Sequence, residues 1–456
     1  MAEGIEQKPD LSKIKFRMIE TNGIKMHIAE QGEGPLVVLC HGFPESWYSW
    51  RHQIPALAAA GFHVVAPDQR GYGKTDRPEA IEDYSTLQLA GDIVGLVRAL
   101  GKEKAIIVGH DWGAAVAAQA SVLRPDMFKA TILLSVPYGP RRKGGTAPME
   151  AARQMPGPKV FYQVYFQQPG VAEAELEKDA RRTILAMLYF ASGDAPADKR
   201  FTGFFDRTGG MLSSLQVPEK LPLWLSDADV DFFAGQFRES GFRGPLNWYR
   251  NIDRNWKIGA FLLDAKLNQP CLFIAGEHDV VVAGFGKGGF DRLEENVPHL
   301  TKKVLIPGKG HWIQQESPNE VNRLMLEFLQ AQNRGRKRDY KTDEINETNG
   351  KLQGLIRGEL SNRRSPNETR HFHPDVFSVY LFRLFLYSLF FLVFGDKDHL
   401  WIVFLVVVGG YTAEEVFHGA AAIDRKEGQL IFRRVDANCG SWQPVLAYEG
   451  DYLFVS

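Results

Sequence analysis

The stretch VGHDWGA, residues 108–114, decides the fold of this chain. An apolar run at 105–108 leads into it, and residues 112–123 follow with apolar side chains at helical spacing. This order of strand, sharp turn and helix is typical of a nucleophile elbow, in which flanking glycines permit a strained turn and close packing. The elbow usually carries serine, whereas this sequence has Asp111 there. We therefore predict that Asp111 is a nucleophile; a simple helix cap is the weaker alternative.

A carboxylate at this position changes the chemistry that the elbow can perform. It attacks saturated carbon without first losing a proton, and the product is an alkyl ester on the enzyme that must then be hydrolysed. A serine would attack a carbonyl carbon instead. Asp111 therefore favours strained or activated C–O or C–halogen bonds over esters and peptides as targets.

Apolar runs alternate with helical patterns along residues 13–333. The runs that predict strands lie at 36–40, 64–66, 105–108, 131–135, 271–275 and 304–306. The stretches that predict helices between some of them include 86–100 and 112–123. Such alternation indicates an α/β protein with a mostly parallel, doubly wound sheet, and together with the elbow it predicts an α/β-hydrolase fold.

The alternation stops between residues 138 and 255, where aromatic residues, proline and glycine are frequent and no strand pattern stands out. We predict an inserted helical cap at 138–255, between a first part of the hydrolase core at 1–137 and a second part at 256–333. Ligands bind at the carboxyl ends of the strands in such sheets, so a cap at that edge would cover the site.

An acid and a histidine follow Asp111 in the order that this fold requires. Asp279 and His311 each come just after an apolar run, where the carboxyl edge of the sheet would present them. We predict that His311 activates water against the ester of Asp111, and that Asp279 orients the imidazole and stabilises its cation. Glu277 and Asp253 are the competing acids, one a step earlier in the same loop and one at the end of the cap.

The turn after the run at 36–40 has the sequence HGFPE, residues 41–45. A turn of small residues there would expose backbone N–H groups opposite the elbow. We predict that the backbone N–H groups of Phe43 and Trp112 form an oxyanion hole. The hole would act in the second step, when water attacks the carboxyl carbon of Asp111.

Residues 13–333 resemble the soluble epoxide hydrolases, most closely the plant type. The motifs that carry the resemblance are HGFPESWYSW (41–50), APDQRGYGKTDRP (66–78), VGHDWGAA (108–115), GEHD (276–279) and GHWIQQE (310–316). The resemblance implies that two cap tyrosines, Tyr162 and Tyr249, hydrogen-bond the epoxide oxygen and protonate the leaving alkoxide. Tyr165 is the alternative to Tyr162.

The same resemblance implies that Glu45 and His110 help to hold the hydrolytic water and that Trp112 lines the substrate slot. It implies lipid-like or aryl epoxides as substrates, water as the second reactant and vicinal diols as products. It implies no metal and no organic cofactor, and it leaves the oligomeric state open.

Two other functions fit part of the pattern. A haloalkane dehalogenase is similar in fold and also has an Asp nucleophile, but it needs side-chain donors that bind halide. Trp112 would fit that role, whereas Phe43 has no such donor. The second alternative is a non-catalytic ligand receptor on the hydrolase scaffold. Such proteins often lack part of the catalytic triad, whereas here Asp111, Asp279 and His311 are all present.

Composition argues against several other classes. Hydrophobic residues make up 44% and charged residues 24%, which is ordinary for a globular protein. The net charge of −1 offers no overall attraction for nucleic acid or acidic membranes. Cys40, Cys271 and Cys439 lack metal-ligand spacing and suggest a reducing compartment. The polar N-terminal stretch lacks the apolar core of a secretory signal, so we expect the enzyme part in the cytoplasm.

Residues 334–456 differ in kind from the rest of the chain. The run at 376–394 holds six Phe and a single charged residue. At about 1.5 Å per residue it is long enough to span a bilayer core of about 30 Å. The arginines at 363–370 would keep the catalytic part on the cytosolic side. A C-terminal membrane anchor, an extension with no evolved fold (such as read-through in a gene model) and a distinct small domain are the three interpretations.

Overall fold

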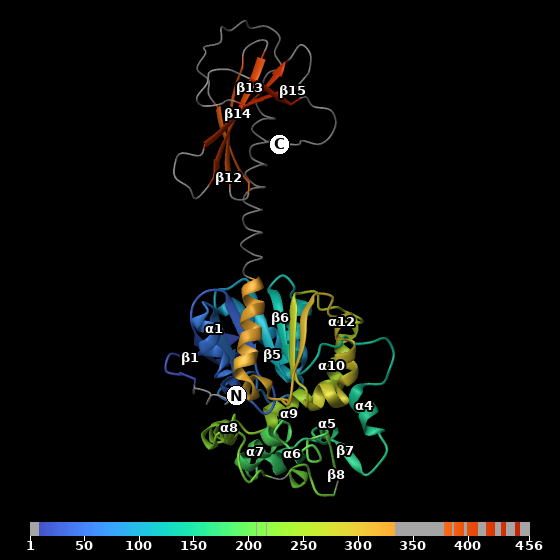
Figure 1. Ribbon diagram of the computed structural model, residues 1–456. Coiled ribbons are helices and arrows are strands. Elements are labelled where there is room, and N and C mark those ends of the chain that lie inside the picture. Colours follow the sequence, from blue (N-terminus) through green and yellow to red (C-terminus); the bar gives the residue numbers. More distant parts are fainter. Residues whose placement is uncertain are drawn as a thin grey trace. The chain divides into compact units, whose positions relative to one another are not determined.

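The computed structural model describes residues 9–332, apart from 207 and 216, and six strands between 378 and 446 (Figure 1). The chain divides into two compact units, Met1–Arg334 and Gly335–Ser456. Cys439 and the arginines at 363–370 lie outside the described residues.

An eight-stranded sheet forms the centre of the first unit, in the order β1-β2-β4-β3-β5-β6-β9-β10. Its strands are β1 (Lys15–Thr21), β2 (Ile24–Gln31), β3 (Leu36–Cys40), β4 (His63–Pro67), β5 (Ala105–His110), β6 (Phe128–Leu134), β9 (Cys271–Gly276) and β10 (Leu300–Ile306). Within this order, each strand from β4 to β10 is parallel to its neighbour, whereas β2 is antiparallel to both β1 and β4. The chain goes from β3 to β4 on one side and returns to β5 on the other, so β3 and β5 flank the topological switch point where open α/β sheets bind ligands.

The central strands are buried on both faces, which explains their continuous apolar runs. Successive side chains alternate between the faces: Val38 and Ile107 join one core cluster, and Val37 and Ile106 join the other. Helices α2 (Thr86–Ala99) and α3 (Trp112–Leu123) contribute to the first cluster, and α1 (Gln53–Ala59) and a helix at 318–332 contribute to the second. The predicted mostly parallel sheet with helices on both faces is confirmed.

The segment between β6 and β9 gathers at one end of the sheet (Figure 1). Its helices are α4 (Pro148–Arg153), α5 (Tyr162–Tyr165), α6 (Val171–Leu176), α7 (Ala180–Phe190), α8 (Asp227–Ser240), α9 (Arg243–Arg250) and α10 (Ile252–Ile258). The sequence suggested no strand here, but β7 (Lys159–Phe161) and β8 (Phe204–Asp206) pair antiparallel. Three-residue strands are too short to show an alternating pattern, which is why the sequence did not reveal them.

The second unit contains one antiparallel sheet in chain order. Its strands are β11 (Ser378–Leu384), β12 (Tyr387–Gly395), β13 (His399–Val408), β14 (Val416–Asp424), β15 (Leu430–Arg434) and β16 (Gln443–Leu446). The apolar run at 376–394, expected as a candidate membrane anchor, thus holds β11 and β12 where a spanning helix was considered. In the described part of the chain, no helix combines the length and apolar character needed to cross a membrane.

Candidate active site

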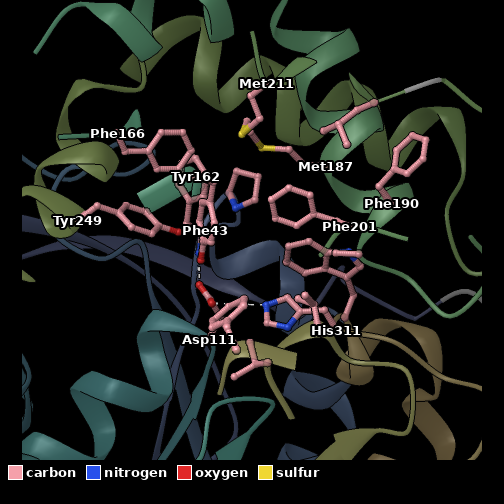
Figure 2. Close-up of a pocket in the computed structure, with 17 residues that line it drawn as sticks. Phe43, Asp111, Tyr162, Phe166, Met187, Phe190, Phe201, Met211, Tyr249 and His311 are labelled. Carbon is pink, nitrogen blue, oxygen red and sulfur yellow. Dashed lines mark hydrogen bonds and ion pairs between the residues drawn. The ribbon is translucent and has the colours of Figure 1, made fainter. Parts of the chain in front are cut away.

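Asp111 occupies a strained turn between β5 and α3. Its φ of 52° and ψ of −122° define a backbone conformation that non-glycine residues rarely adopt. The flanking glycines make the turn possible, because a Cβ on Gly109 would lie 2.1 Å from the carbonyl oxygen of Gly113. A Cβ on Gly113 would lie 2.0 Å from the backbone carbonyl oxygen of Cys40. The local structure is that of the predicted elbow, with the Asp111 side chain turned toward a pocket (Figure 2).

The carboxylate of Asp111 is held from two sides. The backbone N–H of Phe43 donates to Oδ1 at 2.9 Å, and Nε2 of His311 lies 3.4 Å from Oδ2 (Figure 2). A Cβ on Gly42 would lie 2.4 Å from Oδ1, so only glycine lets the turn after β3 approach this closely. Trp112 opens α3, where first-turn N–H groups lack intrahelical partners and carry the positive end of the helix dipole. The site therefore lies between β3 and β5, at the switch point.

His311 and Asp279 form the second half of the site. Nδ1 of His311 lies 3.0 Å from Oδ1 of the buried Asp279, which also accepts from the backbone N–H of Val281 at 2.8 Å. The two competing acids have other partners. Glu277 accepts from the backbone N–H of Gly308, and Asp253 accepts from that of Met149. Of the three acids considered, Asp279 is the one bonded to the imidazole.

The two carboxylates determine the charge of His311. Burial alone would lower its pKa, but attraction to Asp279 and hydrogen bonds with Asp111 and Asp279 raise the pKa well above 6.5. Burial raises the pKa of Asp279, yet the charge of His311 and its hydrogen bond outweigh burial and leave that pKa below its usual value. Both neighbouring carboxyl groups therefore favour the protonated form of the His311 imidazole.

His110 and Glu45 lie behind the site and are completely buried. Nδ1 of His110 lies 2.7 Å from Oε2 of Glu45, and Nε2 lies 2.7 Å from the backbone carbonyl oxygen of His311. The other oxygen of Glu45 accepts from the side chains of Gln314 and Gln315, each at 3.0 Å. Burial raises the pKa of Glu45, but the charge and hydrogen bond of His110 lower it to about 2. Both ring nitrogens of His110 are therefore engaged by protein atoms.

The two predicted tyrosines come together above Asp111. Tyr162 extends from α5 and Tyr249 from α9, with ring centroids 5.8 Å apart, and both line the same pocket as Asp111 (Figure 2). Burial raises the pKa of both phenols above 10, so both are protonated at neutral pH and can donate. Tyr165, the alternative to Tyr162, instead donates its hydroxyl proton to Glu175 at 2.7 Å.

The pocket itself is mostly apolar. It encloses about 580 Å³ of empty space, part of it open to solvent. Its apolar lining includes Phe43, Phe166, Met187, Phe190, Phe201, Met211, Leu215, Val281, Phe285 and Trp312. No pattern in the sequence distinguishes the cap members of this lining, because aromatic residues and methionines are most often simple core. In the described ranges, no group of three or more His, Cys, Asp or Glu side chains could hold a metal ion.

The sheet and the elbow place this chain among the α/β-hydrolases, and the carboxylate at the elbow sets it apart from their serine-dependent members. A family model described as alpha/beta hydrolase fold matches residues 35–318. Epoxide hydrolase A of Mycobacterium tuberculosis is 47% identical over 322 residues, which are 69% of this chain and 96% of that protein. Epoxide hydrolase 3 of Siraitia grosvenorii is 39% identical over 70% of this chain and 99% of its own length.

A solved structure of an epoxide hydrolase from an endophytic Streptomyces is 43% identical. It matches with a TM-score of 0.68 over 71% of this chain and 97% of that one. The chain therefore belongs to the epoxide hydrolases of the α/β-hydrolase family, and the predicted resemblance is confirmed.

Proposed function

We propose that this protein hydrolyses epoxides to vicinal diols through an ester on Asp111. The observation that carries the proposal is the position of the Asp111 carboxylate. It lies 3.4 Å from His311 and 2.9 Å from the N–H of Phe43, beneath two protonated tyrosines, the buried Tyr249 and the partly buried Tyr162. A nucleophile, a base and a pair of acids thus face one apolar pocket.

In the first step the epoxide oxygen accepts hydrogen bonds from the hydroxyl groups of Tyr162 and Tyr249. The carboxylate of Asp111 attacks a ring carbon, the C–O bond of the ring breaks, and a tyrosine proton passes to the alkoxide. Without that proton the alkoxide would be a poor leaving group. The product of this step is a hydroxyalkyl ester of Asp111.

Esterification prepares the second step by changing the charge around His311. The ester of Asp111 is neutral, so part of the interaction that raises the pKa of His311 disappears. His311 can then pass its proton to the tyrosinate that the first step left, and Asp279 holds the neutral imidazole in position to activate water.

Water gives a proton to His311 and attacks the carboxyl carbon of Asp111, and the N–H groups of Phe43 and Trp112 stabilise the oxyanion. Loss of one such donor costs about 3 kcal/mol. The bond between the carboxyl carbon and the ester oxygen of the alkyl group then breaks, the leaving oxygen takes the proton from His311 to complete the diol, and the carboxylic acid of Asp111 returns its own proton to His311.

Glu45 and His110 serve the same step in this proposal. We assign them to holding the hydrolytic water, as the family resemblance implies. Their support is that His110 binds the backbone carbonyl of His311, the residue that activates the water, and that Glu45 binds the backbone N–H of Gly42 in the turn that carries Phe43.

The pocket supports lipid-like or aryl epoxides as the substrate class. Aromatic rings and the thioethers of Met187 and Met211 surround the space above Asp111, and such a lining favours apolar groups around one polar reacting centre (Figure 2). A role in lipid metabolism follows from this substrate class as part of the proposal.

The haloalkane alternative is less well supported by the same contacts. The side chain of Trp112, the candidate halide donor, is hydrogen-bonded with Tyr249, and Phe43 offers no side-chain donor.

Turnover of styrene oxide by the wild-type protein and by Asp111→Ala, with a bromoalkane as second substrate, tests the choice of function. Diol from the wild type alone and no halide release are expected. Halide release without diol would establish a dehalogenase. Equal epoxide binding by both proteins without diol would establish a receptor.

For location we propose the cytoplasm. Cys40 and Cys271 are free, buried thiols, which fits a reducing compartment. Membrane attachment through residues 376–394 is the alternative. Cell fractionation of the full chain beside a chain that ends at Asn333 distinguishes them, because equal recovery of both in the soluble fraction would contradict attachment.

A further inference from the structure

Glu316 holds the backbone on both sides of His311. It ends the short helix α13 (Ile313–Glu316), and its side chain is buried, with 4% exposure. Oε2 accepts from the backbone N–H of Gly310 at 2.8 Å, and Oε1 accepts from that of Trp312 at 3.0 Å. The residue before His311 and the residue after it are therefore fixed by one carboxylate.

The same carboxylate reaches the segment that follows α7. Oε2 of Glu316 also accepts from the backbone N–H of Gly193 at 2.9 Å, and the N–H of His311 donates to the carbonyl of Ala191 at 2.8 Å. The two backbones touch directly, since a Cβ on Gly310 would lie 2.4 Å from the backbone nitrogen of Gly193. Ala191, His311 and Trp312 all line the pocket.

The carboxylate of glutamate suits this position better than the side-chain amide of glutamine would. Three N–H donors converge on its two oxygens, whereas a glutamine would offer one acceptor oxygen and one more donor. Ionisation of Glu316 carries an electrostatic penalty at this position. Burial and the negative charge of Asp194 oppose its ionisation, and despite the three N–H groups the pKa of Glu316 is raised to about 7. Its partners are backbone N–H groups, whereas the buried Glu45 is paired with His110.

We propose that Glu316 is a positioning residue for ester hydrolysis, which fixes the imidazole of His311 over Asp111 and ties it to the cap segment that follows α7. It acts through His311 and does not touch the substrate. The inference rests on the proposed two-step function and adds to it a residue that affects the second step more than the first. His311 is the base of the second step, whereas Asp111 attacks without a base in the first.

The test compares Glu316→Gln with wild type under single-turnover conditions with styrene oxide. The matched control is Glu320→Gln, which alters an exposed glutamate paired with Arg323. Rapid quenching and mass spectrometry give the rates of ester formation and of ester loss. We expect Glu316→Gln to form the ester at nearly the wild-type rate. It should hydrolyse the ester roughly ten- to a hundredfold more slowly, because a misplacement of about 1 Å costs up to about a hundredfold. Glu320→Gln should match wild type in both steps.

Three results would overturn the inference. Wild-type hydrolysis of the ester by Glu316→Gln would show that the carboxylate does not position His311. Equal slowing of both steps would indicate general damage to the fold. Absence of any ester in the wild type would remove the proposed function as well, so the two failures are distinguishable. If Glu316→Gln does not fold, Glu316→Asp replaces it. That variant keeps both carboxylate oxygens on a shorter side chain, so it should slow ester loss less than Glu316→Gln is expected to. A rate of ester loss equal to that of wild type would contradict the inference.

Discussion

The charge of Asp111 should govern the protonation of His311 before any chemistry occurs. In the resting site the pKa of His311 is raised by Asp279 and also by Asp111. Asp111→Asn removes one of these negative charges, so the pKa of His311 should fall relative to wild type. A titration of the His311 imidazole by NMR measures the change. Asp126→Asn, which alters an exposed carboxylate paired with Arg124, is the control and should leave that pKa unchanged. An identical His311 pKa in Asp111→Asn and wild type would contradict the proposal that esterification of Asp111 lets His311 lose its proton.

The two cap tyrosines should matter for ester formation and not for its hydrolysis. Tyr162→Phe and Tyr249→Phe each remove a proton donor from the epoxide oxygen, so ester formation should slow by about a hundredfold or more. Tyr165→Phe is a matched control, because its hydroxyl binds Glu175 away from the reacting atoms. Quenched-flow measurement of the ester gives the rates. A larger effect for Tyr165→Phe than for Tyr162→Phe would reverse the assignment of the donors.

At the scale of elements, the turn after β3 must approach the elbow closely to provide its N–H group. Gly42→Ala would place a Cβ 2.4 Å from Oδ1 of Asp111, so the turn must move and the donor at Phe43 is misplaced. We expect the turnover number to fall roughly a hundredfold, the cost of losing an oxyanion donor. Gly235→Ala is the control, since it lies in α8 with open space around its Cβ and should be as active as wild type and slightly more stable. Full activity of Gly42→Ala would contradict the role of this turn.

Burial explains which elements the sequence revealed. Strands β3, β5 and β9 are buried on both faces, so they appear as continuous apolar runs and were predicted close to their observed bounds. β1 was not assigned, because most of its residues are exposed and it shows no clear apolar run. Strands β7 and β8, at three residues each, give no period at all.

The site residues divide in the same way. Asp111, Asp279 and His311 could be placed because each follows a strand in a fixed order, and that order is visible along the chain. The pairing of Tyr162 with Tyr249 depends on how the cap folds over the sheet, and only the family resemblance indicated it. The contact of Glu316 with Gly193 joins backbones more than a hundred residues apart, so no local pattern could show it.

For the whole molecule, the proposed catalytic groups all belong to the first compact unit, Met1–Arg334. A chain that ends at Asn333 should therefore keep its kcat/KM for styrene oxide, because the unit contains its own core and the complete site. Comparison of this truncated chain with the full chain in the same assay measures the effect. A large loss of kcat/KM on truncation would show that residues 334–456 contribute to the site.

The ester on Asp111 is tested most directly by following oxygen through a single turnover. Enzyme in excess converts an epoxide in water enriched in heavy oxygen, and mass spectrometry locates the label. If Asp111 attacks first, the new hydroxyl of the first diol carries unlabelled oxygen from the carboxylate, and the label appears in Asp111. Heavy oxygen in the diol of the first turnover, with Asp111 unlabelled, would show that water attacks the epoxide directly and would contradict the ester mechanism.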